Sequence, residues 1–62
     1  MKHYLFEIDD ENSEYEGEEF LVGAYSMEEA HDIVALYFGK VHVAYHGRLS
    51  DIDAELSGLD EY

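Results

Sequence analysis

The sequence predicts an α+β fold in the order β-β-α-β-α: a three-stranded antiparallel sheet, one main helix on one of its faces and a short C-terminal helix. Three segments alternate apolar and polar residues with a period of two, which is typical of half-buried strands. Between the second and third of these, apolar residues recur at helical spacing. A length of 62 residues allows one domain, residues 1–62.

The first two strands are predicted over residues 2–9 and 20–25, where apolar and aromatic residues alternate with polar ones. The polar segment 10–17 between them contains Asn12 and Gly17 and is typical of a loop. The strand residues predicted to face the core are Tyr4, Phe6, Ile8, Phe20, Val22 and Ala24.

The main helix has the clearest local signal in the chain. Ser26 is followed three residues later by Glu29, the pattern of a capping box. Gly39 stands where a left-handed residue would end the helix. The apolar stripe expected to pack on the sheet consists of Met27, Ala30, Ile33, Val34, Tyr37 and Phe38.

The third strand is predicted over residues 40–46, with a turn at Gly47 and Arg48. A right-handed crossover through the main helix makes it parallel to the second strand. The first strand then lies in the middle, in the order 2-1-3, antiparallel to both neighbours. The core residues expected from the third strand are Val41, Val43 and Tyr45.

A second, shorter helix is predicted after Ser50, which is placed to cap it, and it ends at Gly58. Its apolar residues include Ile52 and Leu56. We expect residues 60–62 to form a frayed acidic tail, because the ends of small domains are often poorly ordered.

Charge is the most unusual property of the composition. Sixteen Asp and Glu residues stand against three Lys and Arg, for a net charge of −13. Solubility of a small domain needs a net charge of only about 2–8. Direct nucleic-acid or anionic-membrane binding is not expected, because both surfaces repel this charge.

The composition also limits where the protein works. The chain has no cysteine, which excludes disulfides and thiolate metal sites. Its first residues do not resemble a signal peptide, and no apolar run approaches the ~20 residues of a membrane span. We therefore expect a cytoplasmic protein.

The carboxylates fall into three clusters, residues 7–19, 28–32 and 51–61. Closely spaced carboxylates can imitate the phosphates of a duplex and bind Arg and Lys side chains through charge-assisted hydrogen bonds. The alternative is a solvated acidic surface without a partner. Tyr15 and Tyr25 lie beside these clusters and are suited to stacking on Arg. The candidate partner-binding residues are Glu7, Asp9, Asp10, Glu11, Glu14, Tyr15, Glu16, Glu18, Glu19, Tyr25, Glu28, Glu29, Asp32, Asp51, Asp53 and Glu55.

Metal binding and catalysis have little support in the sequence. Calcium loops starting at Asp9 or Asp10 lack the central Gly and the final Glu of an EF-hand. The four histidines have no zinc-site spacing; His42 and His46 are ~13 Å apart in a strand. The two helix-capping serines have no nucleophile motif around them, and a domain of this size has little room for a substrate cleft. We predict a protein without enzymatic activity, metal or cofactor.

The acidic clusters at 7–19, 28–32 and 51–61, the absence of Cys and Pro, and the short ββα-type core resemble a class of small acidic inhibitors encoded by phages and mobile elements. Anti-CRISPR proteins that act as nucleic-acid mimics belong to this class. The resemblance implies a protein that occupies the basic nucleic-acid channel of a Cas effector and blocks target DNA binding.

The sequence thus predicts a DNA-mimic inhibitor whose partner is a basic nucleic-acid-binding protein. The alternative is a non-catalytic interaction module, such as an antitoxin or accessory subunit, that recognises its partner by shape. Such a module would depend on Leu5, Tyr25, Ile52 and Leu56 more than on the acidic loop. A monomer and a homodimer formed through the open edge of strand two or three are both compatible with either function.

Overall fold

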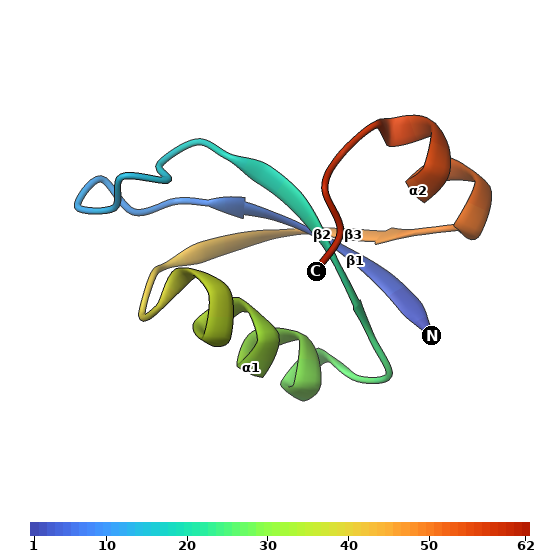
Figure 1. Cartoon of the computed structure of the whole chain (residues 1–62), viewed down its shortest axis with the longest axis horizontal. Coiled ribbons are helices and arrows are strands. Elements are labelled where there is room, and N and C mark those ends of the chain that lie inside the picture. The colour runs from blue at the N-terminus through green and yellow to red at the C-terminus, as the bar shows by residue number, and fades with distance from the viewer.

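The computed structural model describes residues 1–62 and contains three strands and two helices. They are β1 (Lys2–Ile8), β2 (Glu19–Ala24), α1 (Met27–Phe38), β3 (Val43–Leu49) and α2 (Asp51–Ser57). The strands form one sheet in the order β2-β1-β3, and β1 is antiparallel to both neighbours. The predicted α+β fold and strand order are confirmed, with α1 and α2 on opposite sides of the sheet (Figure 1).

The core lies between the sheet and α1. The rings of Phe6 and Phe20 stack at a centroid distance of 6.0 Å, and Phe20 also contacts Phe38 of the helix at 4.5 Å. Burial of large aromatic side chains is the main source of stability in so small a domain. The buried residues of this core are Tyr4, Phe6, Ile8, Phe20, Val22, Ala24, Ala30 and Val34.

The N-terminus of α1 is capped as the sequence predicts. The Ser26 hydroxyl accepts a hydrogen bond from the Glu29 backbone N–H at 3.1 Å. The Glu29 carboxylate reaches back one residue further than a standard capping box and accepts from the Tyr25 N–H at 3.1 Å. At the other end Gly39 has φ 75° and ψ −158°, so its φ is positive as expected but its ψ lies outside the left-handed helical region.

β3 differs from the sequence prediction at both ends. It begins at Val43 and continues through Gly47 and Arg48 to Leu49, so the predicted turn at these two residues is wrong. The register with β1 shifts at this point, because Phe6 faces Tyr45 while Leu5 faces Gly47. The additional residue, His46, forms a β-bulge, and the φ of 108° at Gly47 is one that glycine adopts without strain.

β3 is also less covered than expected. α1 packs mainly over β2, the strand at the opposite edge of the sheet from β3. Tyr45 of β3 is therefore 46 % exposed, although its ring contacts those of Tyr4 and Phe6. Tyr37 on α1, also predicted to be in the core, is 57 % exposed. The prediction for Tyr45 is wrong because one helix of this length covers only part of a three-stranded sheet. The prediction for Tyr37 is wrong because its ring packs against Tyr62 of the C-terminal segment and not in the core.

The last residues pair with the outer edge of β2, and the predicted frayed tail is wrong. The Leu21 N–H donates to the Asp60 carbonyl at 2.9 Å, and the Tyr62 N–H donates to the Leu21 carbonyl at 2.8 Å. A third bond joins the Gly23 N–H to the Tyr62 carbonyl at 2.9 Å. Leu21 points away from α1 yet is almost fully buried. The C-terminal segment therefore covers one of the two sheet edges.

α2 lies on the face of the sheet opposite α1 (Figure 1). The Ser50 hydroxyl accepts from the Asp53 N–H at 3.1 Å, and Gly58 is left-handed with φ 70°, as predicted. No residue of α2 is buried, and Ile52 and Leu56 are 69 % and 78 % exposed. Neither helix is long and apolar enough to cross a membrane.

Candidate partner-binding surfaces

The acidic loop between β1 and β2 is held by turns and by two of its own carboxylates, those of Asp10 and Glu16. Asp10 Oδ1 accepts from the Asn12 N–H at 3.0 Å, and its Oδ2 accepts from the His42 N–H at 3.2 Å. The Gly17 N–H donates to the Ile8 carbonyl at 2.9 Å and closes the base of the loop. Asp10 therefore links the loop to the segment that leads into β3.

The two candidate tyrosines have different environments. Tyr15 is half-buried, and its ring meets that of Phe38 edge-on at a centroid distance of 5.2 Å. Tyr15 therefore anchors the loop on α1, and less of its ring is available for stacking on Arg. Tyr25, between β2 and α1, is 72 % exposed and free to contact a partner.

The carboxylates divide into two groups. The side chains of Glu7, Asp51 and Glu61 pair with histidines, and those of Asp10, Glu16 and Glu29 accept from backbone N–H groups. The other ten form no hydrogen bond or ion pair, and neither Lys nor Arg pairs with any carboxylate. These ten available side chains are Asp9, Glu11, Glu14, Glu18, Glu19, Glu28, Asp32, Asp53, Glu55 and Asp60.

The acidic clusters are distributed along the whole molecule. The acidic loop lies at one end of the longest axis and α2 at the other (Figure 1). This axis measures 33 Å, about one turn of a DNA duplex (~34–36 Å). Sixteen carboxylates over 33 Å give one per about 2 Å, close to the ~1.7 Å per phosphate of a duplex.

Two carboxylates meet across the sheet where the acidic loop begins. Glu7 of β1 is opposite Glu19 of β2 in the register of the strands. On its other side Glu7 Oε1 lies 2.9 Å from His46 Nε2, which is the residue of the β-bulge. Like charges directly opposite each other are destabilising, so this pair is a structural cost of the acidic surface.

The histidines do not assemble a metal site. No group of three or more His, Asp or Glu side chains is arranged to hold a metal ion. His3 instead lies between two carboxylates, with Nε2 at 2.6 Å from Asp51 Oδ1 and Nδ1 hydrogen-bonded to Glu61. The bond to Glu61, and then that to Asp51, raises the pKa of His3 above its ordinary value.

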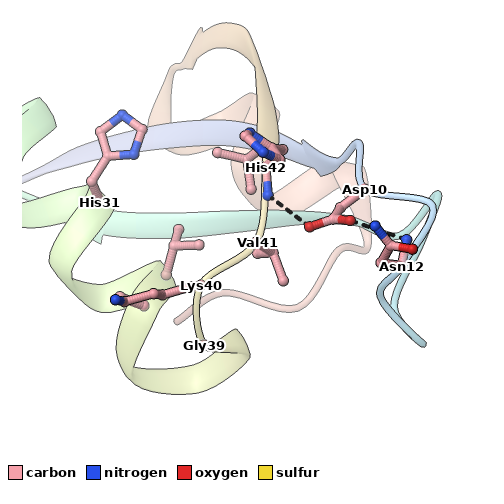
Figure 2. A pocket seen from close by; sticks show the side chains of 10 residues that line it. Asp10, Asn12, His31, Gly39, Lys40, Val41 and His42 are labelled. Carbon is pink, nitrogen blue, oxygen red and sulfur yellow. Dashed lines mark hydrogen bonds between the residues drawn. The ribbon is translucent and has the colours of Figure 1, made fainter.

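A pocket of about 540 Å³ lies where the C-terminal half of α1 meets the start of β3. Figure 2 shows His31 and Lys40 on the helix side, Asp10 and Asn12 on the loop side and His42 between them. The remaining lining is mostly apolar, from Val34, Ala35, Val41 and Val43. The pocket is larger than we expected for a domain of this size.

Most residues around this pocket belong to the only long segment without acidic residues. Positions 33–50 contain no Asp or Glu, although the chain has sixteen, and they include Lys40 and Arg48, two of its three Lys and Arg residues. The sequence prediction missed this second surface because it considered where carboxylates gather and not where they are absent. The gap itself was visible in the sequence.

Comparisons with protein-family models, curated proteins and solved structures found no match. The structure itself presents three kinds of exposed chemistry. They are the available carboxylates, the apolar residues Ile52 and Leu56 on α2, and the basic edge along β3.

Proposed function

We propose that this protein is a non-catalytic inhibitor that occupies the nucleic-acid-binding surface of a basic partner protein. The observation that supports this most directly is the number of available carboxylates. Ten of sixteen have no partner within the chain, and they extend along a molecule as long as about one duplex turn. A groove of Arg and Lys built for phosphates offers these carboxylates charge-assisted and bidentate hydrogen bonds.

The partner class follows from electrostatics. A net charge of −13 attracts a basic surface over long range and speeds encounter. The same charge disfavours direct contact with nucleic acid. A CRISPR–Cas effector is the partner that the resemblance to anti-CRISPR proteins implies, and blocked target DNA binding is the corresponding action.

The acidic loop is proposed as the main contact and α2 as the second. Four carboxylates of the loop region, Glu11, Glu14, Glu18 and Glu19, are exposed and form no internal bond. Asp10 and Glu16 hold the loop together, so they support the contact surface and are poor choices for mutation.

The first test is capture of partners from a lysate of the source host at low salt, followed by elution in a salt gradient. We expect one basic nucleic-acid-handling complex to be released steeply with salt and displaced by competing duplex DNA. In a direct assay, target-DNA binding by a purified guide-loaded Cas effector should fall as the protein is added. A partner that is retained at high salt and is not displaced by competing duplex DNA would contradict mimicry.

The second test separates a specific surface from bulk charge. Reversing Glu11, Glu14, Glu18 and Glu19 to Lys should abolish binding. A matched control reverses four available carboxylates elsewhere, Glu28, Asp32, Asp53 and Glu55, and changes the net charge by the same amount. Because Asp53 and Glu55 belong to the proposed second contact, the control should weaken binding without abolishing it, and equal losses in the two variants would contradict the loop as the main contact.

The exposed apolar residues of α2 favour a second candidate function. Ile52 and Leu56 lie one helical turn apart and form an exposed apolar pair, and exposed apolar patches mark interaction sites. Tyr25 is of a residue type enriched among interface hot spots. Leu5, expected to belong to this set, is half-buried in the sheet. An interaction module of this kind would tolerate the loop reversals and lose its partner when Ile52 and Leu56 are changed to Ser.

A further inference from the structure

We propose that the free edge of β3, together with the pocket beside it, binds an extended acidic peptide segment of a partner protein as a fourth strand of the sheet. This site is separate from the acidic surface and has the opposite charge preference. It would let the protein hold a basic surface and an acidic segment at the same time.

The two edges of the sheet differ in their backbone hydrogen bonding. The edge of β2 is covered by backbone hydrogen bonds to Asp60 and Tyr62, whereas β3 pairs only with β1. The Asp9 N–H donates to the His42 carbonyl at 2.9 Å. Because bonded positions alternate along an antiparallel ladder, the backbone groups of Val43 and Tyr45 point away from β1. An added strand can pair with them.

The pocket gives this edge a place for a side chain. It lies beside Val43, at the start of the strand, and its apolar lining comes from both α1 and β3. A volume of about 540 Å³ accommodates a large apolar side chain of an added strand. In peptide recognition by strand addition, backbone bonds supply affinity and such pockets supply specificity.

The charge around the edge selects an acidic occupant. Lys40 and His42 line the pocket and Arg48 lies further along β3. Neither Lys40 nor Arg48 is neutralised by a carboxylate of the chain. The one acidic side chain in the lining, Asp10, already accepts two backbone N–H groups. A carboxylate-bearing strand therefore finds uncompensated cations here.

A second copy of this chain fits the edge poorly. Antiparallel pairing of two β3 strands offers Lys40 and Arg48 no carboxylate partner from the same segment, because positions 33–50 contain no Asp or Glu. Each copy also carries a net charge of −13. The homodimer through strand three, one of the two options left open by the sequence, is therefore disfavoured by the charge of β3 and by the net charge of each copy.

A pair of synthetic peptides tests the proposal on the full chain. The first is a ten-residue peptide in which Glu alternates with Val, and the second has Lys in place of each Glu. Binding is followed by two-dimensional NMR of the ¹⁵N-labelled protein at an ionic strength of about 0.15 M, where the Debye length of about 8 Å limits repulsion from distant carboxylates. We expect the Glu–Val peptide to shift the amide signals of Val43 and Tyr45 and to slow their exchange with solvent. The Lys–Val peptide should act on the acidic loop instead.

Two variants at one position separate strand pairing from side-chain contact. Tyr45→Pro removes an N–H that faces outward and makes no bond to β1, and it should weaken binding of the Glu–Val peptide about tenfold or more. Tyr45→Val keeps the N–H and should retain binding. If Tyr45→Pro does not fold, the double variant Lys40→Glu, Arg48→Glu tests the charge preference instead. It should weaken binding of the Glu–Val peptide to a similar extent.

Three results would overturn the proposal. The first is no response of β3 amides to the Glu–Val peptide at millimolar concentration. The second is that Tyr45→Pro binds the Glu–Val peptide as tightly as the wild type does. The third is that the double variant Lys40→Glu, Arg48→Glu binds this peptide as tightly as the wild type does. Reversal of the four loop carboxylates should leave this binding in place, so failure here is distinct from failure of the acidic surface.

Discussion

His3 Nε2 lies 2.6 Å from Asp51 Oδ1 and thereby joins the start of β1 to the start of α2, 48 residues away. The other ring nitrogen bonds to Glu61, in the segment that pairs with β2. Both carboxylates accept hydrogen bonds, so only the protonated ring can donate to both. One charged imidazolium thus holds α2 and the C-terminal segment on the same face of the sheet.

This arrangement predicts that stability falls as pH rises above the ordinary pKa of His3. The folded-state pKa of His3 is raised by its bonds to Glu61 and Asp51. The stabilisation is therefore complete below the unfolded pKa of about 6.5 and is lost as pH rises through the higher folded value. We expect the thermal midpoint of the wild type to decrease over this window, as measured by circular dichroism.

The control is His3→Gln, which keeps a hydrogen-bond donor and removes the titration. The difference in midpoint between wild type and His3→Gln should be largest near pH 6 and shrink at pH 9. Since His31, His42 and His46 are retained in both proteins, they cancel in this difference. A difference that does not change with pH would show that His3 acts only through packing.

Removing the C-terminal segment should destabilise the protein although that segment is at the chain end. Deletion of residues 59–62 exposes Leu21 and breaks three backbone bonds to β2, and we expect a loss of about 2–3 kcal/mol in the free energy of unfolding. Tyr62→Ala keeps the backbone bonds and loses only ring contacts, so its cost should be about 1 kcal/mol. Urea denaturation measures both. Equal stability of the deletion and the wild type would mean that the pairing is not maintained in solution.

The parts of the fold that were predictable are those specified by neighbouring residues. The caps at Ser26 and Ser50 and the alternation in β1 and β2 depend on residues a few positions apart. The strand order then follows from the handedness of the crossover. Gly47 was ambiguous because the same residue is typical of a turn and of a bulge.

The parts that were not predictable depend on contacts between distant residues. The last residues cover Leu21 on the face of the sheet away from α1 and pair with it. Nothing within residues 60–62 indicates this contact. The positions of the acidic clusters were readable, but the structural role of Asp10 was not, because it accepts the His42 N–H from 32 residues away along the chain.

The bulge in β3 can be tested at Gly47. Its φ is 108°, and a Cβ placed there would meet no atom within 4 Å, so the cost of Gly47→Ala is backbone strain alone. We expect a loss of about 1–3 kcal/mol in the free energy of unfolding. A D-alanine at this position, introduced by chemical synthesis, accepts a positive φ and should restore most of the stability. Identical effects of the two isomers would argue against the bulge geometry.

The two helix caps should have unequal effects. Ser26→Ala uncaps α1, which carries the buried residues Ala30 and Val34, so global stability should fall by about 0.5–2 kcal/mol. Ser50→Ala uncaps α2, which buries no residue, so it should increase amide hydrogen exchange within α2 and leave the unfolding midpoint almost unchanged. Similar midpoints for the two variants would contradict this separation.

The cross-strand pair Glu7 and Glu19 predicts a substitution that stabilises the protein. The Ile8 N–H donates to the Glu18 carbonyl, so the adjacent pair of glutamates is of the non-hydrogen-bonded kind, in which side chains approach more closely. Glu19→Gln should raise the free energy of unfolding by about 0.2–1 kcal/mol at low salt. Glu14→Gln makes the same charge change in the loop, without an acidic residue opposite it, and should have a smaller effect. Because salt screens this repulsion, the advantage of Glu19→Gln over Glu14→Gln should shrink as salt is added. An advantage that is absent at low salt would mean that the hydrogen bond between Glu7 and His46 already holds the two carboxylates apart, and the acidic surface would then carry no local penalty at this point of the sheet.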